Sequence, residues 1–204
     1  MRLYHHPMSS NARRATMTAL QLGTDVELVF VDLAKGEHKK PDFLRLNPGG
    51  KVPVLEDGDF ALTESHAIMQ YLCDKTPGQT LYPTELRARA DVNRWLFWNA
   101  AHFQSSVAIL NWEHVVKRFL NLGDPDPAAV QKGEGLVRDL GKLLDDHLAG
   151  KTWISGDALT LADLAIATPL DALDRAKLPV RDFTNVMSWL GRVQALDAWK
   201  KTGM

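Results

Sequence analysis

The stretch from Asn47 to Ile68 holds residues whose types and spacing can do chemistry. Glu64 and Ser65 stand at the expected start of a helix, where backbone N–H groups are free and a side-chain hydroxyl is added. A helix N-terminus of this kind binds anions. Val52-Pro53 opens an expected strand, where a proline often marks a cis peptide bond at a functional edge. Together these groups can hold a small peptide-like ligand that carries a carboxylate at one end.

A second group of candidates is the run Met8-Ser9-Ser10-Asn11, between the first expected strand and the first expected helix. A hydroxyl at this position can point at a ligand while the helix N–H groups add positive potential. The same residues are also good helix caps, and the run taken alone favours capping. A cap alone would also explain Glu64-Ser65. His38-Lys39 suits an exposed carboxylate, but by itself it indicates only a solvated loop.

Composition places the chain among packed globular proteins with one domain or two small ones. It has 204 residues, of which 45% are hydrophobic and 24% charged. The formal net charge of -1 argues against a nucleic-acid partner. The single cysteine, Cys73, excludes an internal disulfide and a Cys-x-x-Cys redox pair. It lies in an apolar helical run, so we expect a buried, inert thiol.

Targeting and metal signals are also absent from the sequence. No apolar run is long enough to span a membrane, and Met1 leads directly into a strand-like segment, so a cytoplasmic location is expected. The seven histidines are scattered and lack the spacing of a zinc site, so no metal is expected.

The first part of the chain alternates between strand and helix patterns. Asp57-Gly58 is a strong turn signal between two short strands. The expected elements are a strand at 2–5, a helix at 11–22, a strand at 26–31, a short helix at 39–46, strands at 52–55 and 60–62, and a helix at 64–74. This β-α-β-α-β-β-α order predicts a thioredoxin-like α/β domain over residues 1–76.

The second part of the chain reads as helices only. Turn residues over 77–83 indicate a linker. Thr160-Leu161-Ala162-Asp163 has the pattern of a capping box at a helix start. The expected helices run from 84 to about 120, 127–148, 161–175, and one or two short ones lie within 182–200. These predict an all-α domain over residues 84–204.

Residues 3–14 resemble the start of serine-type glutathione transferases, most like the plant phi class and its bacterial relatives. In that class the serine after the first strand activates the thiol of glutathione, and the matching position is Ser9. Ser10 is next, because a shift of one residue would exchange the two, and Asn11 would help to orient a donor. Tyr4 lies inside the strand, too early for the role of the tyrosine in tyrosine-type classes, and we expect it in the core.

The resemblance also implies a glutathione site. The pair His38-Lys39, within residues 36–41, matches the residues that contact the glycine carboxylate. Val52 matches the residue whose backbone pairs with the cysteinyl unit as an added antiparallel strand, and Pro53 matches a cis-proline. Lys51 stands where the phi class usually has glutamine, and it can still reach a ligand carboxylate.

Glu64-Ser65 matches the pair that receives the γ-glutamyl end. Ser65 and its N–H would take the carboxylate, and Glu64 would face the amino group. The spacing from Pro53 to this pair, with a hairpin between, is the more specific signal. His66 stands where arginine is frequent, and no role is assigned to it. Residues 159–164 resemble the capping segment of the transferase helical domain.

The helix expected after residue 84 lines the electrophile pocket and the dimer interface in this family. Trp95 and Trp98 are interpreted as packing residues. The pocket candidates are Met8, His102, Phe103 and Trp112.

The resemblance therefore implies a cytosolic, homodimeric glutathione transferase that uses glutathione as co-substrate and a small hydrophobic electrophile. The bound thiolate would attack the electrophile without a covalent enzyme intermediate. Two alternatives stay open at this point. One is a glutathione-dependent peroxidase or disulfide reductase on the same scaffold, and the other is a non-catalytic ligand-binding protein.

Overall fold

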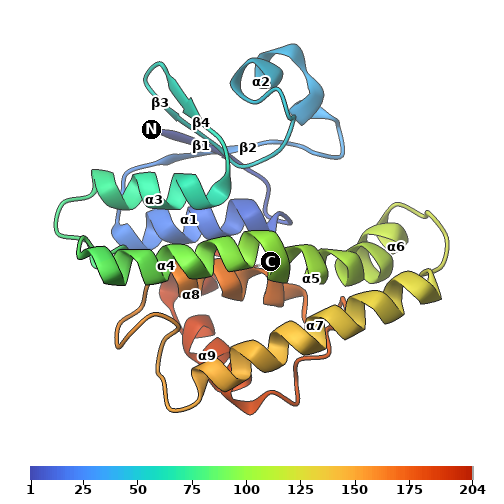
Figure 1. The fold of residues 1–204 in the computed structure, drawn as a ribbon. Helices are drawn as coiled ribbons and strands as arrows, with labels where there is room; N and C mark the ends of the chain where they lie inside the picture. The colour runs from blue at the N-terminus through green and yellow to red at the C-terminus, as the bar shows by residue number, and fades with distance from the viewer. Residues whose placement is uncertain (204) are drawn as a thin grey trace. The chain divides into compact units, whose positions relative to one another are not determined.

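The computed structural model describes residues 1–203 (Figure 1). By internal packing the chain forms two compact units. The first comprises residues 1–82 together with the segment from Ala195 onward, and the second comprises Pro83–Gln194. The expected helical domain ran to residue 204, whereas the segment after Gln194 packs with the first unit.

The first unit contains the four expected strands, which form one mixed sheet. Its strands are β1 (Arg2–His5), β2 (Glu27–Phe30), β3 (Val54–Asp57) and β4 (Phe60–Leu62), in the order β2-β1-β3-β4. β1 runs parallel to β2 and antiparallel to β3, and β4 is antiparallel to β3. β3 begins at Val54, two residues later than expected, since Pro53 has no N–H to donate to the sheet.

The helices of this unit are α1 (Ser10–Leu22), α2 (Pro41–Leu46), α3 (Ser65–Lys75) and α10 (Asp197–Thr202). The expected helix at 39–46 is split into a 3-10 turn over Glu37–Lys39 and α2. The split falls at Lys40, which is extended with φ -69° and ψ 148°. Pro41 causes it, because a residue before proline is forced away from the helical region.

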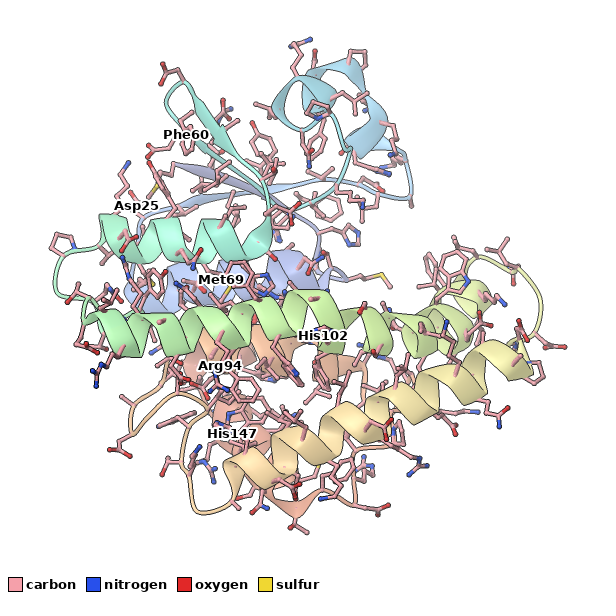
Figure 2. The ribbon with its side chains drawn as sticks, in the orientation of Figure 1. Asp25, Phe60, Met69, Arg94, His102 and His147 are labelled. Carbon is pink, nitrogen blue, oxygen red and sulfur yellow. The ribbon has the colours of Figure 1, made fainter. Side chains whose placement is uncertain are left out.

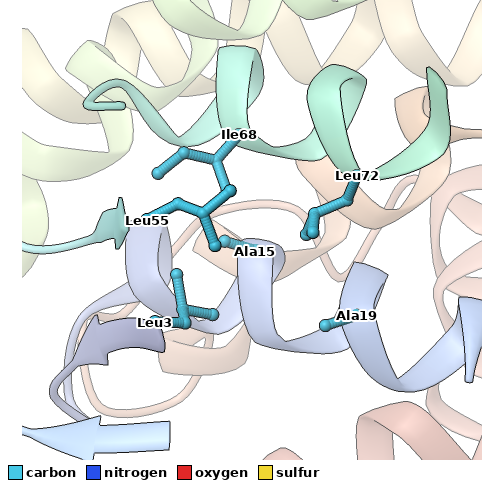
Figure 3. Packing of buried hydrophobic residues seen from close by; sticks show 6 residues of the cluster. All are labelled: Leu3, Ala15, Ala19, Leu55, Ile68 and Leu72. Carbon is cyan, nitrogen blue, oxygen red and sulfur yellow. The ribbon is translucent and has the colours of Figure 1, made fainter. Parts of the chain in front are cut away.

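The sheet carries a different helix layer on each face. Leu3 and Leu55 are paired neighbours of β1 and β3, and they point to the face covered by α1 and α3. Their cluster also contains Ala15, Ala19, Ile68 and Leu72 (Figure 3). Val54 points to the opposite face, where it packs in a second cluster with Phe43 of α2. Apolar packing therefore covers both faces of the sheet and fixes the positions of its strand ends.

The second unit is built from helices: α4 (Leu86–Trp98), α5 (Gln104–Asn111), α6 (Lys117–Phe119), α7 (Pro127–Leu148), α8 (Leu161–Ala167) and α9 (Thr184–Gln194). The single helix expected from 84 to about 120 contains two wide π turns, at Asn99–Phe103 and Trp112–Val116. α8 ends at Ala167, earlier than expected, and continues as a 3-10 turn over Thr168–Ala172 that contains Pro169.

The predicted capping box at the start of α8 is confirmed. Thr160 and Asp163 exchange the two expected bonds. The Asp163 carboxylate is fully buried and also accepts from the Ile154 N–H at 2.9 Å and the Trp189 Nε1–H at 2.8 Å. It therefore ties the preceding loop and α9 to the start of α8. Within residues 1–203, no helix is both long and apolar enough to cross a membrane.

Candidate functional site

Four segments of the first unit leave the sheet at the same edge. β1 and β2 are parallel and both end there, with His5 opposite Phe30. β3 starts at that edge, since Tyr4 near the end of β1 pairs with Val54. β4 ends there, since Leu62 pairs with Leu55. The topology thus brings together the starts of α1 and α3, the segment after β2 and the residues before β3.

Ser9 is the N-cap of α1, with φ -87° and ψ 110°. Its Oγ accepts a hydrogen bond from the Ala12 N–H at 3.2 Å, so the capping role is real. A hydroxyl has one donor and two acceptor positions, and the cap uses only an acceptor. The O–H of Ser9 can therefore donate to a ligand while the cap stays in place, and accepting from Ala12 polarises that donor. Ser10 differs in being the first residue inside the helix.

Tyr4 is engaged elsewhere, as expected for a core residue. Its hydroxyl donates to the Glu56 carboxylate at 2.8 Å, and its ring meets Phe43 edge-on with 6.0 Å between centroids. Burial, with the Glu56 bond second, raises the pKa of the Tyr4 hydroxyl. A phenol that is hard to ionise and already donating is poorly suited to stabilise a thiolate.

The Val52–Pro53 peptide bond is cis, as predicted, and both residues are buried. Val52 packs in the same apolar cluster as Ala12, which lies in the first turn of α1. It precedes Val54, the residue of β3 that pairs with Tyr4. The β1–β3 pairing therefore does not use the N–H and C=O of Val52, and both suit an added peptide strand.

α3 starts without a side-chain cap. Glu64 stands at the N-cap with φ 66° and ψ 110°, and its carboxylate makes no capping bond. A left-handed conformation in a residue other than glycine costs about 1–3 kcal/mol and is concentrated at functional sites. Ser65, the first helical residue, is buried. Capping alone therefore does not explain this pair, and the first-turn N–H groups of α3 suit an anion.

The basic residues of the site gather around Gly50. A Cβ built on Gly50 would lie 2.8 Å from Lys39 Nζ and 3.0 Å from the His38 carbonyl oxygen, so the His38-Lys39 turn lies against this glycine. The loop is held by Asn47, whose Nδ2 donates to the Lys51 carbonyl at 2.8 Å. Within the described chain, His38 Nδ1 is buried without a hydrogen-bond partner. A ring nitrogen without a partner, next in sequence to the Lys39 ammonium, fits a ligand carboxylate.

Sequence reasoning missed one pair beneath the site. Arg14 of α1 is fully buried, and its Nη1 lies 3.0 Å from Nε2 of His66 in α3. Guanidinium can only donate, so His66 accepts and is neutral. Burial, with the Arg14 charge second, lowers the pKa of His66 to about 3. The pair ties the first turn of α3 to α1, and no local sequence signal marks it.

The pocket candidates differ in exposure. Met8 in the first unit is half exposed. In the second unit His102 is exposed (Figure 2), Trp112 is 45% exposed, and Phe103 is fully buried with its ring stacked 5.2 Å from Trp98. Trp95 is buried and packs against Trp98, as expected.

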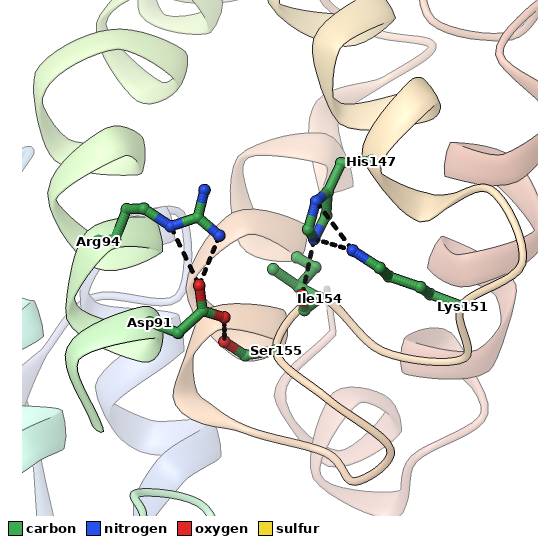
Figure 4. Close-up of polar contacts among 6 residues, drawn as sticks. All are labelled: Asp91, Arg94, His147, Lys151, Ile154 and Ser155. Atoms are coloured by element: carbon green, nitrogen blue, oxygen red, sulfur yellow. Dashed lines mark hydrogen bonds and ion pairs between the residues drawn. The ribbon is translucent and has the colours of Figure 1, made fainter. Parts of the chain in front are cut away.

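A polar cluster in the second unit contains serine, aspartate and histidine but is not arranged for nucleophilic catalysis (Figure 4). The Ser155 hydroxyl donates to the Asp91 carboxylate, which also accepts from Arg94. His147 Nε2 bonds the Ile154 carbonyl at 2.8 Å rather than the serine. The cluster fastens the loop around residue 155 to α4 and α7.

Comparisons with known proteins match both units of the chain. The family models for the N-terminal and C-terminal domains of glutathione S-transferase match residues 1–74 and 103–197. Glutathione S-transferase 3 of Zea mays is 38% identical, covering 99% of this chain and 92% of that protein. The crystal structure of glutathione transferase F2 from Populus trichocarpa has a TM-score of 0.90 at 27% identity, covering 98% of this chain and 96% of that one.

A third relative was solved with a ligand. The structure of glutathione S-transferase-I bound with lactoylglutathione has a TM-score of 0.88 at 27% identity, covering 98% of this chain and 97% of that one. Sequence and fold thus agree over nearly the whole chain, including both units and the segments that form the sheet edge. The chain belongs to the glutathione S-transferase family.

Proposed function

We propose that this glutathione S-transferase is of the serine type and that Ser9 donates the hydrogen bond that holds glutathione as its thiolate. The observation that carries the proposal is the Ser9 hydroxyl, which caps α1 as an acceptor and keeps its proton for donation. The relatives' names favour conjugation over the peroxidase, reductase and non-catalytic alternatives.

The energetics of thiol activation are within reach of this arrangement. A free thiol has a pKa of about 8.5, so only a few per cent is ionised at pH 7. Lowering that pKa by ~2 units requires about 2.7 kcal/mol in favour of the thiolate. One hydrogen bond to a charged group supplies ~1.5–3 kcal/mol, and the N-terminus of α1 adds to it. The thiol proton leaves to solvent. The sulfur lone pair forms the new bond to the electrophilic carbon, while the bond from that carbon to its leaving group breaks and the leaving group takes the electron pair.

The remaining site residues would hold the rest of glutathione. Ser65 and the first-turn N–H groups of α3 would take the γ-glutamyl carboxylate, and Glu64 would face its amino group. The backbone of Val52, beside the cis Pro53, would pair with the cysteinyl unit. The glycine carboxylate would lie among His38, Lys39 and Lys51. The ligand named for the related glutathione S-transferase-I supports a glutathione moiety as the bound group.

The second substrate would be a small hydrophobic electrophile. In the first unit, the half-exposed Met8 would offer a thioether to an apolar molecule. In the second unit, the half-exposed Trp112 would offer an indole and the exposed His102 a polar group. Phe103 would act by packing, because its ring is buried against Trp98.

The assembly would be a cytoplasmic homodimer that uses α4. Phe97 and Leu86 of this helix are 73% and 79% exposed, so α4 offers apolar side chains that a second subunit could cover.

The decisive experiment is a pH titration of the ultraviolet thiolate absorbance of glutathione bound to the purified protein. We expect a midpoint well below that of free glutathione, raised in Ser9→Ala and unchanged in Ser10→Ala. The Ser10 variant is a matched control, since it removes the neighbouring hydroxyl from the same helix start. Saturable binding with an unshifted midpoint would refute thiol activation. A midpoint that is raised in Ser10→Ala but not in Ser9→Ala would identify Ser10 as the donor.

A further inference from the structure

Arg13 of α1 links this helix to the short helix α10. Arg13 is 5% exposed, and the carbon of its guanidinium lies 3.9 Å from the centre of the Trp199 ring. Its Nε donates to Thr202 Oγ1 at 3.1 Å, and its Nη2 donates to the Trp199 carbonyl at 3.1 Å. The Trp199 ring and the two acceptors contact the flat guanidinium from three directions, and all three groups belong to α10. We call this set of contacts the Arg13 clasp.

The clasp is held in place on the side of α10. The Thr202 hydroxyl donates to the Ala198 carbonyl at 2.8 Å, which leaves its oxygen lone pair aimed at Arg13. Trp199 is itself buried, with 8% exposure. Bonds and packing within α10 thus hold the Thr202 hydroxyl and Trp199 in place for Arg13.

The other side of the clasp is the first turn of α1. The Arg13 N–H donates to the Ser9 carbonyl at 2.8 Å, and the Ala12 N–H donates to the Ser9 hydroxyl at 3.2 Å. Ser9 is thus placed by hydrogen bonds from two successive residues, and the second of them carries the clasp. Displacement of Arg13 would rotate the donors that set the direction of the Ser9 hydroxyl.

We infer that Arg13, held by Trp199 and Thr202, is a positioning residue for thiol activation, because α10 fixes the first turn of α1 and thereby aims the Ser9 hydroxyl. The inference rests on the proposed role of Ser9. Catalytic hydrogen bonds are sensitive to small shifts, since ~1 Å of misplacement can cost ~100-fold in rate. A helix that touches no substrate can therefore control the thiolate.

The test repeats the thiolate titration on full-length variants of the clasp. We expect Trp199→Leu to raise the apparent pKa of bound glutathione by about one unit, which is about tenfold less thiolate below the midpoint. Thr202→Val, a milder and nearly isosteric change, should raise it by about half a unit. Arg13→Lys should behave like Trp199→Leu, because an ammonium keeps the charge but cannot match the planar fork.

Two controls separate positioning from stability and from the role of Ser9. Leu72→Ala removes packing at the far end of α3 in the same unit, so it should lower the melting temperature without moving the thiol pKa. In a Ser9→Ala background, Trp199→Leu should cause no further shift, since the clasp acts through that hydroxyl.

The outcomes are distinguishable. If Ser9→Ala leaves the thiol pKa unchanged, the proposed function fails and the clasp loses its target. If Ser9→Ala raises the pKa but the Arg13, Trp199 and Thr202 variants do not, only the positioning role is overturned. A shift of equal size in Leu72→Ala, or an additive shift in the double variant, would likewise overturn it.

Discussion

At the scale of single residues, the buried pair Arg14 and His66 shows how the fold sets protonation. Burial lowers the pKa of Arg14 to about 9, so the guanidinium is still protonated at neutral pH and donates to His66. The same burial, together with that charge, lowers the pKa of His66 to about 3. The imidazole therefore serves as a neutral acceptor beneath the start of α3.

This pair predicts part of the acid sensitivity of the protein. A histidine in the unfolded chain titrates near pH 6.5. Between about pH 6.5 and 3, His66 is therefore protonated in the unfolded chain but neutral in the folded chain. The stability that His66 contributes is full above that window and is lost as the pH falls through it. The slope is at most about 1.4 kcal/mol per pH unit. Urea unfolding from pH 7 to 4 should therefore show a shallower pH dependence in His66→Gln than in the unchanged protein.

Glutamine is the informative substitution, because its side-chain oxygen can still accept from Arg14. Other titrating groups are present in both proteins and cancel in the difference. Parallel stability curves for the two proteins would contradict the assignment of a neutral, buried His66.

Tyr4 gives a second prediction at this scale. Tyr4→Phe removes only the hydroxyl that donates to Glu56. We expect a stability loss of about 1.5–3 kcal/mol, as for one hydrogen bond to a charged group, and no change in the thiol pKa of bound glutathione. Chemical denaturation and the thiolate titration measure the two effects. A raised thiol pKa in this variant would reassign the donor from serine to tyrosine.

The sequence predicts the candidate site residues at the sheet edge better than it predicts the buried contacts that hold their helices in place. The positions of Ser9, Pro53 and Ser65 relative to strand ends and helix starts are local patterns, and the structure brings these segments to one edge. The Arg14–His66 contact joins positions 52 residues apart, and the Arg13–Trp199 contact joins positions 186 apart. Such contacts depend on tertiary packing, which no local spacing encodes.

At the scale of elements, α7 contains one glycine that its packing requires and one that its packing does not require. A Cβ built on Gly141 would lie 2.6 Å from a ring carbon of Phe183, so this glycine allows the helix to approach the segment before α9. Gly135, on the same helix, has nothing within 4 Å of a built Cβ. The first glycine is required by packing, and the second is only a weak helix former.

The two glycines predict stability changes of opposite sign. Gly141→Ala should destabilise by about 1–3 kcal/mol, because the ring or the helix must move. Gly135→Ala should stabilise by about 0.4–1 kcal/mol, because alanine loses less backbone entropy. Thermal and urea unfolding of both variants would measure the two stability changes. Destabilisation by Gly135→Ala would contradict the open space around this glycine.

The predicted boundaries of an element agree with the structure where neighbouring residues determine them, and they differ where tertiary packing determines them. α7 begins and ends where predicted, with Pro127 in its first turn. The two π turns after α4 were not predicted, because they widen a helix without interrupting its apolar pattern. The first π turn contains the pocket candidates His102 and Phe103, and the second begins at the pocket candidate Trp112.

At the scale of the whole molecule, the proposed homodimer gives a test of α4. Phe97→Asp places a charge on its exposed apolar surface, and we expect it to shift the protein toward monomer in light scattering at micromolar concentration. Phe119→Asp, at a similarly exposed phenylalanine in α6, is the matched control and should leave the mass unchanged. A dimer that resists the first change but not the second would place the interface at α6.

The return of the chain to its first unit after Gln194 constrains how the protein is made. Translation releases residues 1–82 first, but the partners of Arg13 in α10 are synthesised only after the entire helical unit. The helix that carries Arg13 therefore lacks these neighbours until residues 197–202 have emerged from the ribosome. A gene fragment that stops at Tyr82 would encode every residue proposed to bind glutathione, yet would leave the Arg13 side chain uncovered.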